Sequence, residues 1–377
     1  MRTILFVCLL LWSQKTLAQE KPKIEFDGQF SIIGSYSPEA EKEVFLGGRY
    51  LPELNLDVPI DSLRSFAAEV SANVAGNTAF HPFSEGESRG EVGLYRAWAR
   101  YTHRQIEVRA GLQKIDFGAA TILRPLQWFN QIDPRDPLQL TNGVYGVLGR
   151  YYFLNNANIW LWTLYGNEKT RGFDAIETNA RIPEFGGRVQ LPVPKGEIAF
   201  SYHHRTANSS DAGFLPVFEE IPENRFGLDG KWDLGIGLWA EASVVHKAKD
   251  LGIFTTQSLL NVGTDYTFGI GNGLNAVVEH LVISNDSQLL TFENTVHLSA
   301  IAASYPLGFF DNLNAVLLYS WSTKDVTFNL NYEHQFKKFT GYVTIYYNPD
   351  TPVGFQQNDL VNLFPGPGIR LTAVYNH

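Results

Sequence analysis

Hydrophobic and polar residues alternate with a period of two through most of the chain. Near its start, Ile24, Phe26 and Phe30 alternate with Glu25 and Gln29. Successive side chains of a β-strand point to opposite faces, so this pattern predicts strands with one apolar and one polar face. The alternation recurs in segments 24–36, 46–57, 65–75, 91–102, 104–113, 143–153, 158–166, 185–194, 197–206, 224–234, 237–248, 257–268, 273–284, 294–305, 312–322, 326–335, 338–348 and 367–377.

Each segment is close to the ~9–11 residues that a tilted strand needs to cross a membrane. The pattern predicts about eighteen strands, within a range of about 16–18 because strand ends are weakly marked in a sequence. An even number fits bacterial single-chain barrels. We therefore expect an all-β protein, a closed antiparallel transmembrane β-barrel, because closure leaves no unpaired strand edge.

The connections between these segments are alternately short and long. Short ones contain turn-forming residues, as in Asn155-Asn156 and Pro194-Lys195-Gly196. Outer-membrane barrels have short periplasmic turns and long extracellular loops, so we expect the long connections to be extracellular. The connection at 322–325 is an exception, because its position should be external but it is short. The long connections are 76–90, 114–142, 167–184, 207–223 and 349–366.

The composition favours a membrane location. Aromatic residues make up 14% of the chain and charged residues 18%, and the latter value is below the ~25% of ordinary soluble domains. No apolar run after the N-terminal segment approaches the ~20 residues of a transmembrane helix. Aromatic residues such as Tyr101, Trp160 and Trp232 recur near the ends of predicted strands, where outer-membrane barrels carry aromatic girdles.

The N-terminus predicts export. Arg2 precedes an apolar run at 4–12, and Thr16-Leu17-Ala18 follows with small residues at the expected cleavage position. We interpret residues 1–18 as a signal peptide and 19–377 as the barrel. The alternative is an N-terminal membrane anchor, but the run is shorter than the ~20 residues that a spanning helix needs. The expected location is the outer membrane of a Gram-negative bacterium, crossed many times.

Charge and cysteine usage exclude several classes of site. Removing Arg2 and Lys15 from the 30 basic residues leaves 28 against 39 acidic ones, a net charge of −11. This balance argues against nucleic-acid binding, which needs a basic surface. Cys8 is the single cysteine and lies in the expected signal peptide, so the mature chain has no disulfide and no thiolate metal site.

The longest connection, 114–142, is unusually apolar for a loop in solvent. It contains the clusters Ile122-Leu123 and Leu126 to Phe129, followed by the sequence Asp133-Pro134-Arg135-Asp136-Pro137. Prolines stiffen such a segment because they fix φ and remove a hydrogen-bond donor. We expect the segment to fold inward and narrow the lumen. The alternative is an external cap that packs on neighbouring loops or on another subunit.

Arginines on the polar faces of predicted strands, several of them near this loop, are candidate channel-lining residues. An arginine stays charged even in a confined lumen, and rings of charged side chains set selectivity in pores. Acidic residues of the loop would then create a field across a constriction. The alternative is that the arginines pair with lumenal acids such as Glu53, Glu69, Glu107 and Glu197 and fill the interior. The candidates are Arg49, Arg96, Arg100, Arg109, Arg150 and Arg188 on the strands, and Asp116, Arg124, Asp133, Arg135 and Asp136 in the loop.

One segment resembles a known family. The sequence Val108-Arg109-Ala110-Gly111-Leu112-Gln113 is followed by Phe117-Gly118, Arg124-Pro125-Leu126, Phe129-Asn130 and the 133–137 segment. This arrangement resembles porin-like outer-membrane channels, and loosely the alginate-export-type barrels. The resemblance covers about a tenth of the chain and implies a lumenal passage without naming a solute. Many such barrels end in an aromatic residue, whereas this chain ends in His377 with Tyr375 two positions before it.

These observations favour a channel for passive or facilitated passage of small to medium solutes, with no cofactor and no metal. A second hypothesis is a plugged structural or interaction barrel, an adhesin or a component of an envelope complex. A third is a barrel hydrolase, which would need a histidine near a serine or aspartate; no metal-binding spacing such as HExxH occurs. The expected partners are outer-membrane lipid, lipopolysaccharide, the barrel-assembly machinery and small solutes, and no nucleic acid. The oligomeric state is left open. The candidate histidines are His203, His204, His246, His280, His297 and His334.

Overall fold

The computed structural model describes residues 21–82, 86–213, 215–350 and 365–377. The expected signal peptide, 1–18, lies outside these residues. No helix in the described ranges is long and apolar enough to cross a membrane. The first strands are β1 (Lys23–Tyr36), β2 (Val44–Asp61), β3 (Arg64–Phe80), β4 (Glu87–His103), β5 (Ile106–Gln113), β6 (Val144–Tyr152), β7 (Asn158–Leu164), β8 (Glu177–Thr178), β9 (Glu184–Val193) and β10 (Gly196–Asn208). The remaining strands are β11 (Ile221–Asp233), β12 (Gly237–Lys247), β13 (Thr256–Phe268), β14 (Leu274–Asp286), β15 (Thr295–Pro306), β16 (Asp311–Ser320), β17 (Val326–Gln335), β18 (Thr340–Asn348) and β19 (Gly366–Asn376).

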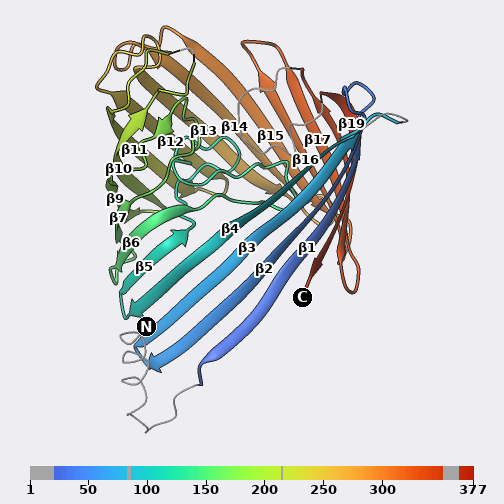
Figure 1. Cartoon of the computed structure of the whole chain (residues 1–377), viewed down its shortest axis with the longest axis horizontal. Helices are drawn as coiled ribbons and strands as arrows, with labels where there is room; N and C mark the ends of the chain where they lie inside the picture. The colour runs from blue at the N-terminus through green and yellow to red at the C-terminus, as the bar shows by residue number, and fades with distance from the viewer. Residues whose placement is uncertain (1–20, 83–85, 214, 351–364) are drawn as a thin grey trace.

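The strands form one closed antiparallel sheet, drawn in Figure 1. Each long strand pairs with its neighbours in sequence, and β1 pairs with both β2 and β19, so the ring has no free edge. In the part of the chain that the structure describes, nineteen strands are present. One of them, β8, is a two-residue strand that pairs only with the end of β10, while β7 pairs directly with β9. The other eighteen close the barrel and confirm the predicted fold and strand number.

The two faces of the wall have opposite chemistry. On β11, Phe226 and Leu228 point outward and are exposed, whereas Glu223, Arg225 and Asp229 point inward and are buried. A soluble protein would bury the apolar face and expose the polar one. Here the apolar side chains form the outer surface, as the alternating pattern predicted, and such a surface suits contact with lipid.

The two ends of the barrel also differ. Turns such as 62–63, 104–105 and 194–195 close one end, and Arg104, Asn156 and Lys195 adopt positive φ there because these turns are tight. The long connections 114–143 and 165–183 lie at the other end. The connection expected at 76–90 is shorter than predicted, because β3 extends to Phe80 and β4 begins at Glu87. The connection at 321–325 is short on the long-loop side, as its sequence indicated.

Introducing a charge on the outer face should disturb insertion into a bilayer. Leu228 lies in the middle of β11 and is 59% exposed. We expect Leu228→Arg to destabilise the barrel folded in lipid vesicles by about 2–4 kcal/mol, because the charge would face hydrocarbon. Ile236, in a turn at the rim, is the control, and Ile236→Arg should cost about 0–1 kcal/mol. Equal effects of the two substitutions would contradict this orientation of the wall.

Candidate functional site

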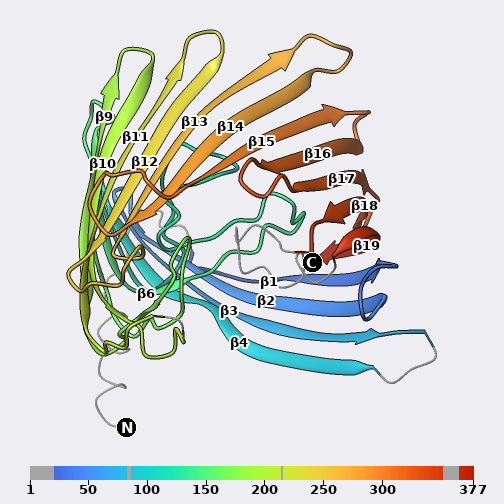
Figure 2. The ribbon, with the colours of Figure 1, turned by 90° about the horizontal axis from the view of Figure 1, so that it is seen from above.

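The connection between β5 and β6 lies inside the barrel. Figure 2 shows this segment (teal) within the ring of strands. Ile115, Leu123, Leu126, Trp128 and Phe129 of this segment are almost completely buried, which a loop in solvent would not achieve. The inward course that its apolar sequence predicted is therefore the observed one, and residues 114–143 are called the lumenal loop below.

One apolar cluster of the lumenal loop packs on the wall at β6 and β7. Phe117 stacks on Trp162 with ring centroids 5.7 Å apart, and Phe129 meets the same ring edge-on at 5.5 Å. Such aromatic pairs add stability beyond the area that they bury. Gly227 of β11 allows the loop to approach, because a Cβ there would lie 2.5 Å from the side chain of Leu126. The cluster consists of Ile115, Phe117, Leu126, Trp128, Phe129, Val144, Leu148, Trp162 and Leu164.

The other apolar cluster lies on a different part of the wall. Ile122 and Leu123 pack against inward-pointing side chains of β13 to β16. A lumenal wall in contact with water would be polar. These inward side chains are apolar because the lumenal loop covers them and keeps them away from water. The wall residues are Leu259, Leu281, Leu298, Ala300, Val316 and Leu318.

Between these clusters the backbone of the loop is held by Glu241 of β12. Its side chain accepts hydrogen bonds from the backbone N–H groups of Ala119 at 2.8 Å, Ala120 at 2.9 Å and Leu126 at 2.6 Å. Gly118, with φ of 110°, permits this approach, because a Cβ at that position would lie 2.6 Å from the carboxylate. A single buried side chain therefore fixes both sides of a tight bend in the loop.

Glu279 of β14 holds the next stretch in the same way. It accepts backbone hydrogen bonds from Thr121 at 2.7 Å, Ile122 at 3.1 Å and Leu123 at 2.5 Å. Trp239 and Asn261 of the wall also donate to it, each at 3.1 Å. Together the two carboxylates accept hydrogen bonds from six backbone N–H groups of the loop.

Sequence reasoning missed both glutamates. One sign in the sequence could have found them, an acid among inward apolar residues. Glu279, for example, lies on the inward face of β14 between the apolar side chains of Val277 and Leu281. An isolated acid among apolar lumenal residues needs hydrogen-bond donors from elsewhere.

The rest of the loop reaches the opposite side of the barrel. Arg135 pairs with Asp133 at 2.8 Å and donates to Asn348 of β18 at 3.4 Å. Arg96 of β4 donates to the backbone oxygen of Thr141 at 3.0 Å. The lumenal loop is thus attached to the wall at several separate places around the ring.

The six arginines predicted to line the channel are all on inward positions of their strands. Arg109 and Arg150 share Glu107, at 3.6 and 3.2 Å, and Arg188 pairs with Asp229 at 2.6 Å. The last pairing brings in an acid that sequence reasoning did not name. The expected pairing with lumenal acids holds for Glu107, whereas Glu197 accepts a hydrogen bond from Gln190 instead.

Arg49, Arg96 and Arg100 differ from the other three, because none of them has an acidic group within 4.0 Å in the described residues. Arg96 donates instead to the backbone oxygens of Tyr95 and Thr141 and to the Thr141 hydroxyl. Arg100 lies beside Arg109 across the β4–β5 pair, and both guanidinium groups lie over the ring of Trp98, at 5.5 and 4.5 Å from its centroid. Arg150 similarly lies 4.0 Å from the centroid of Trp160. The aromatic rings thus support a row of cations on β4, β5 and β6.

Two of the three loop acids that were expected to face the strand arginines pair with cations of the loop itself. Asp116 pairs with Arg124 of its own loop and with Lys114 at 3.4 Å, and Asp133 pairs with Arg135. These carboxylates stabilise the loop internally instead of facing the strand arginines across a gap. The nearest cations of Asp116 and Asp133 are therefore those of the loop, and a field between the loop acids and the strand arginines stays a prediction.

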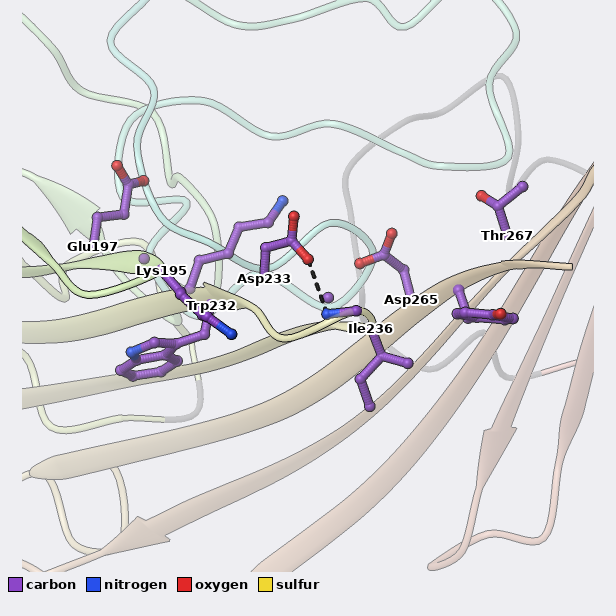
Figure 3. Close-up of a pocket in the computed structure, with 12 residues that line it drawn as sticks. Lys195, Glu197, Trp232, Asp233, Ile236, Asp265 and Thr267 are labelled. Atoms are coloured by element: carbon purple, nitrogen blue, oxygen red, sulfur yellow. Dashed lines mark hydrogen bonds between the residues drawn. The ribbon is translucent and has the colours of Figure 1, made fainter.

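A recess of about 610 Å³ opens at the short-turn end of the barrel, under the turns after β9 and β11. Figure 3 shows Lys195, Glu197, Asp233 and Asp265 around it. Lys231 also lines it, so the recess has charges of both signs. Sequence analysis gave no sign of it, because its residues come from separate turns.

The histidines do not form a metal site. In the described ranges no group of three or more His, Cys, Asp and Glu residues is placed to hold a metal ion. His203 is buried, accepts a hydrogen bond from the indole of Trp162 at 3.1 Å and lies 3.0 Å from Glu184. His280 and His297 are on outward positions, 3.3 Å apart.

Comparisons with known proteins identify relatives in fold. No family model matches the chain, and no curated protein matches it. Among solved structures, OccK5 (OpdH) of Pseudomonas aeruginosa is 10% identical with a TM-score of 0.57, covering 95% of this chain and 98% of that one. OccAB1 of Acinetobacter baumannii is 8% identical with a TM-score of 0.56, covering 94% and 96%. OmpT, an outer membrane protein of Vibrio cholerae in a trimer form, is 10% identical with a TM-score of 0.52, covering 95% and 100%. At these identities the similarity establishes a shared barrel fold.

Removing both wall carboxylates should release the lumenal loop. Hydrogen bonds to charged groups contribute about 1.5–3 kcal/mol each, so we expect the double variant Glu241→Ala/Glu279→Ala to expose the buried Arg135. Limited trypsin digestion with mass analysis should show cleavage after Arg135 at least about ten times faster than in the wild type. Glu197→Ala is the matched control, since that lumenal carboxylate accepts from Gln190. Unchanged protection in the double variant would show that the apolar clusters alone hold the loop.

Proposed function

We propose that the chain is a channel in the outer membrane of a Gram-negative bacterium, for passive or facilitated passage of small to medium solutes. The observation that carries this proposal is the lumenal loop, which enters the barrel and is bound to its wall by Glu241 and Glu279. A loop fixed within a wide barrel narrows the passage and sieves solutes by size. The apolar outer wall and the unequal ends support the membrane location.

The arginine row supports a preference for anions. Arg100, Arg109 and Arg150 lie on adjacent inward positions, and one acid, Glu107, is shared by the last two. Arg49, on β2, adds a further cation without an acidic partner within 4.0 Å among the described residues. A lumen with excess positive charge lowers the energy of an anion that passes through it.

Relatives in fold are consistent with this proposal but do not name a solute. The Vibrio cholerae neighbour is described as an outer membrane protein, and we propose the same location here. Outer-membrane lipid and lipopolysaccharide would contact the apolar outer surface, and the barrel-assembly machinery would insert it. The resemblance to alginate-export-type barrels stays a prediction, as does the absence of enzymatic activity.

One observation favours a second candidate, a barrel plugged by its own loops that serves as an interaction protein. Gln131 of the lumenal loop donates to the backbone oxygen of Gly172 at 2.8 Å, so the connection between β7 and β9 contacts it inside the barrel. Two loops that hold one another would block a lumen more completely than one. Conductance separates the two candidates.

Shortening the lumenal loop should widen the channel. Gln113 and Val144 are paired across β5 and β6, so a short Gly-Ser turn can replace residues 115–142 without a change of register. We expect single-channel conductance in a planar bilayer to rise about twofold or more, because the constriction is removed. Shortening the exposed connection 287–294 is the control and should leave conductance near the wild-type value. Unchanged conductance in the first variant would argue against a constriction.

Neutralising two of the arginines that have no acidic partner should weaken anion preference. We expect Arg49→Gln/Arg100→Gln to reduce the anion-to-cation permeability ratio about twofold or more, because two lumenal charges are lost. The measurement is the reversal potential under a gradient of potassium chloride. Lys324→Gln, in an exposed loop, should leave it unchanged. The same reversal potential in the wild type, the double variant and Lys324→Gln would contradict the electrostatic part of the proposal.

A further inference from the structure

Two neighbouring turns at the short-turn end of the barrel expose large apolar side chains. The turn between β15 and β16 carries Phe309, which is fully exposed, and Phe310, which is 61% exposed. The turn between β17 and β18 carries Phe336 and Phe339, both exposed. Tight turns in contact with water are normally rich in small and polar residues. Four exposed phenylalanines on adjacent turns therefore indicate an apolar partner.

Backbone hydrogen bonds join the two turns into one surface. The N–H of Gln335, at the end of β17, donates to the Phe310 carbonyl at 2.8 Å. Within the second turn the Phe336 N–H donates to the Phe339 carbonyl at 2.9 Å, and the two rings stack with centroids 4.4 Å apart. The phenylalanines are thus held in place by the turns themselves.

The stacked rings lie on the outer face of the wall. A Cβ at Gly341 of β18 would lie 3.1 Å from the ring of Phe336 and 3.9 Å from that of Phe339. Gly341 is on the same face of β18 as Val343 and Ile345, which are exposed on the outside. The phenylalanines therefore continue the apolar outer surface as far as the rim. This continuity favours lipid as the partner, because the adjoining strands carry the surface that suits lipid.

Two lysines lie between the stacked rings in the sequence. Lys337 and Lys338 form the tip of the same turn and are exposed. Neither ammonium group has a carboxylate within 4.0 Å among the described residues. Asp311, at the start of β16, is instead paired with His334 at 2.6 Å. On a chain whose net charge is −9, these two cations are available to an anionic partner.

Apolar rings and lysines in one turn fit the two parts of an anionic lipid. Acyl chains would contact the phenylalanines, and the ammonium groups would lie beside the phosphate, as long basic side chains do at membrane interfaces. A soluble anion would use the lysines and leave the rings in water, and a neutral lipid would use the rings alone. The short turns are expected on the periplasmic side, where the leaflet of an outer membrane consists of phospholipids.

We propose that these two turns form a binding site for an anionic phospholipid at the periplasmic edge of the barrel. The lysines bind the lipid phosphate and the phenylalanines contact the acyl chains. The site lies outside the wall, so it goes beyond the proposed passage and rests only on the membrane location. It is called the rim site below and consists of Phe309, Phe310, Phe336, Lys337, Lys338 and Phe339.

Competition between two lipids tests the rim site. The refolded barrel in a neutral detergent is given an equimolar mixture of phosphatidylglycerol and phosphatidylcholine with identical acyl chains, and native mass spectrometry counts the lipids that stay bound. We expect the wild type to retain phosphatidylglycerol about five times more often than phosphatidylcholine, because only the former has a net negative charge. Equal retention of the two lipids would overturn the rim site and favour a protein partner at this surface.

Substitution of the lysines tests whether they provide this preference. Lys337→Gln/Lys338→Gln should remove the preference and leave the retention of phosphatidylcholine unchanged, whereas Lys337→Arg/Lys338→Arg should keep the preference. The matched control is Lys195→Gln/Lys324→Gln, which removes the same charge from two exposed lysines outside the rim site and should behave like the wild type. A preference that survives the loss of Lys337 and Lys338 would place the lipid elsewhere and overturn the proposal.

Substitution of the stacked rings tests the apolar part of the site. Phe336→Ala/Phe339→Ala should lower the retention of both lipids about threefold or more, because the acyl chains lose apolar contact area. Unchanged retention in this variant would show that the rings do not contact lipid, which contradicts the proposal.

Glycerol phosphate shows whether the site takes a lipid or a free anion. At a concentration equal to that of the lipid it should not displace phosphatidylglycerol, because the headgroup alone makes no contact with the rings. Displacement would assign the lysines to a soluble anion and overturn the lipid. Because lipid binding requires no ion flow, a barrel that conducts without a lipid preference loses the rim site and keeps the channel.

Discussion

The arrangement of this molecule depends on one constraint, that backbone N–H groups brought inside a barrel must find acceptors there. Strands satisfy this rule by pairing around the closed ring. The lumenal loop has no such ladder, and Glu241 and Glu279 supply the acceptors that its residues 119–126 lack. Carboxylates suit this task because each accepts several hydrogen bonds and because charged acceptors make the stronger ones. Two side chains of the wall thus hold residues 119–126 of the loop, between its two apolar clusters.

The same constraint explains why the interior is not uniform. Between β13 and β16 the inward side chains are apolar, because the loop covers them. Between β9 and β12 they are charged, and the connection after β7 completes their pairing through Asp174. From β4 to β6 they form the row of arginines over Trp98 and Trp160, with fewer acids than cations. The interior thus has three kinds of wall. One is apolar and fixes the loop, one carries paired buried charges, and one is proposed to attract anions.

Much of the fold could be predicted from the sequence because a membrane barrel repeats one pattern, and the period of two gives both the strands and their faces. The inward course of the lumenal loop could also be predicted, because the apolar clusters Ile122-Leu123 and Leu126 to Phe129 would be unfavourable in contact with solvent. Pairing was less predictable. Asp116 and Asp133 bind cations of their own loop, and β8 is too short to leave a pattern. Glu241 and Glu279 acquire their partners only when segments more than 30 residues apart meet, so the partners of these acids could not be predicted from the sequence around them.

The central claim is that the bound loop narrows the lumen and leaves a passage through it. The most direct measurement is the current through the wild-type barrel, refolded and inserted into a planar lipid bilayer. The account predicts discrete, stable and ohmic steps, smaller than those of an unobstructed barrel with the same number of strands. A barrel that inserts, as heat modifiability and protection by lipid would show, but never conducts would contradict it and favour a plugged interaction protein.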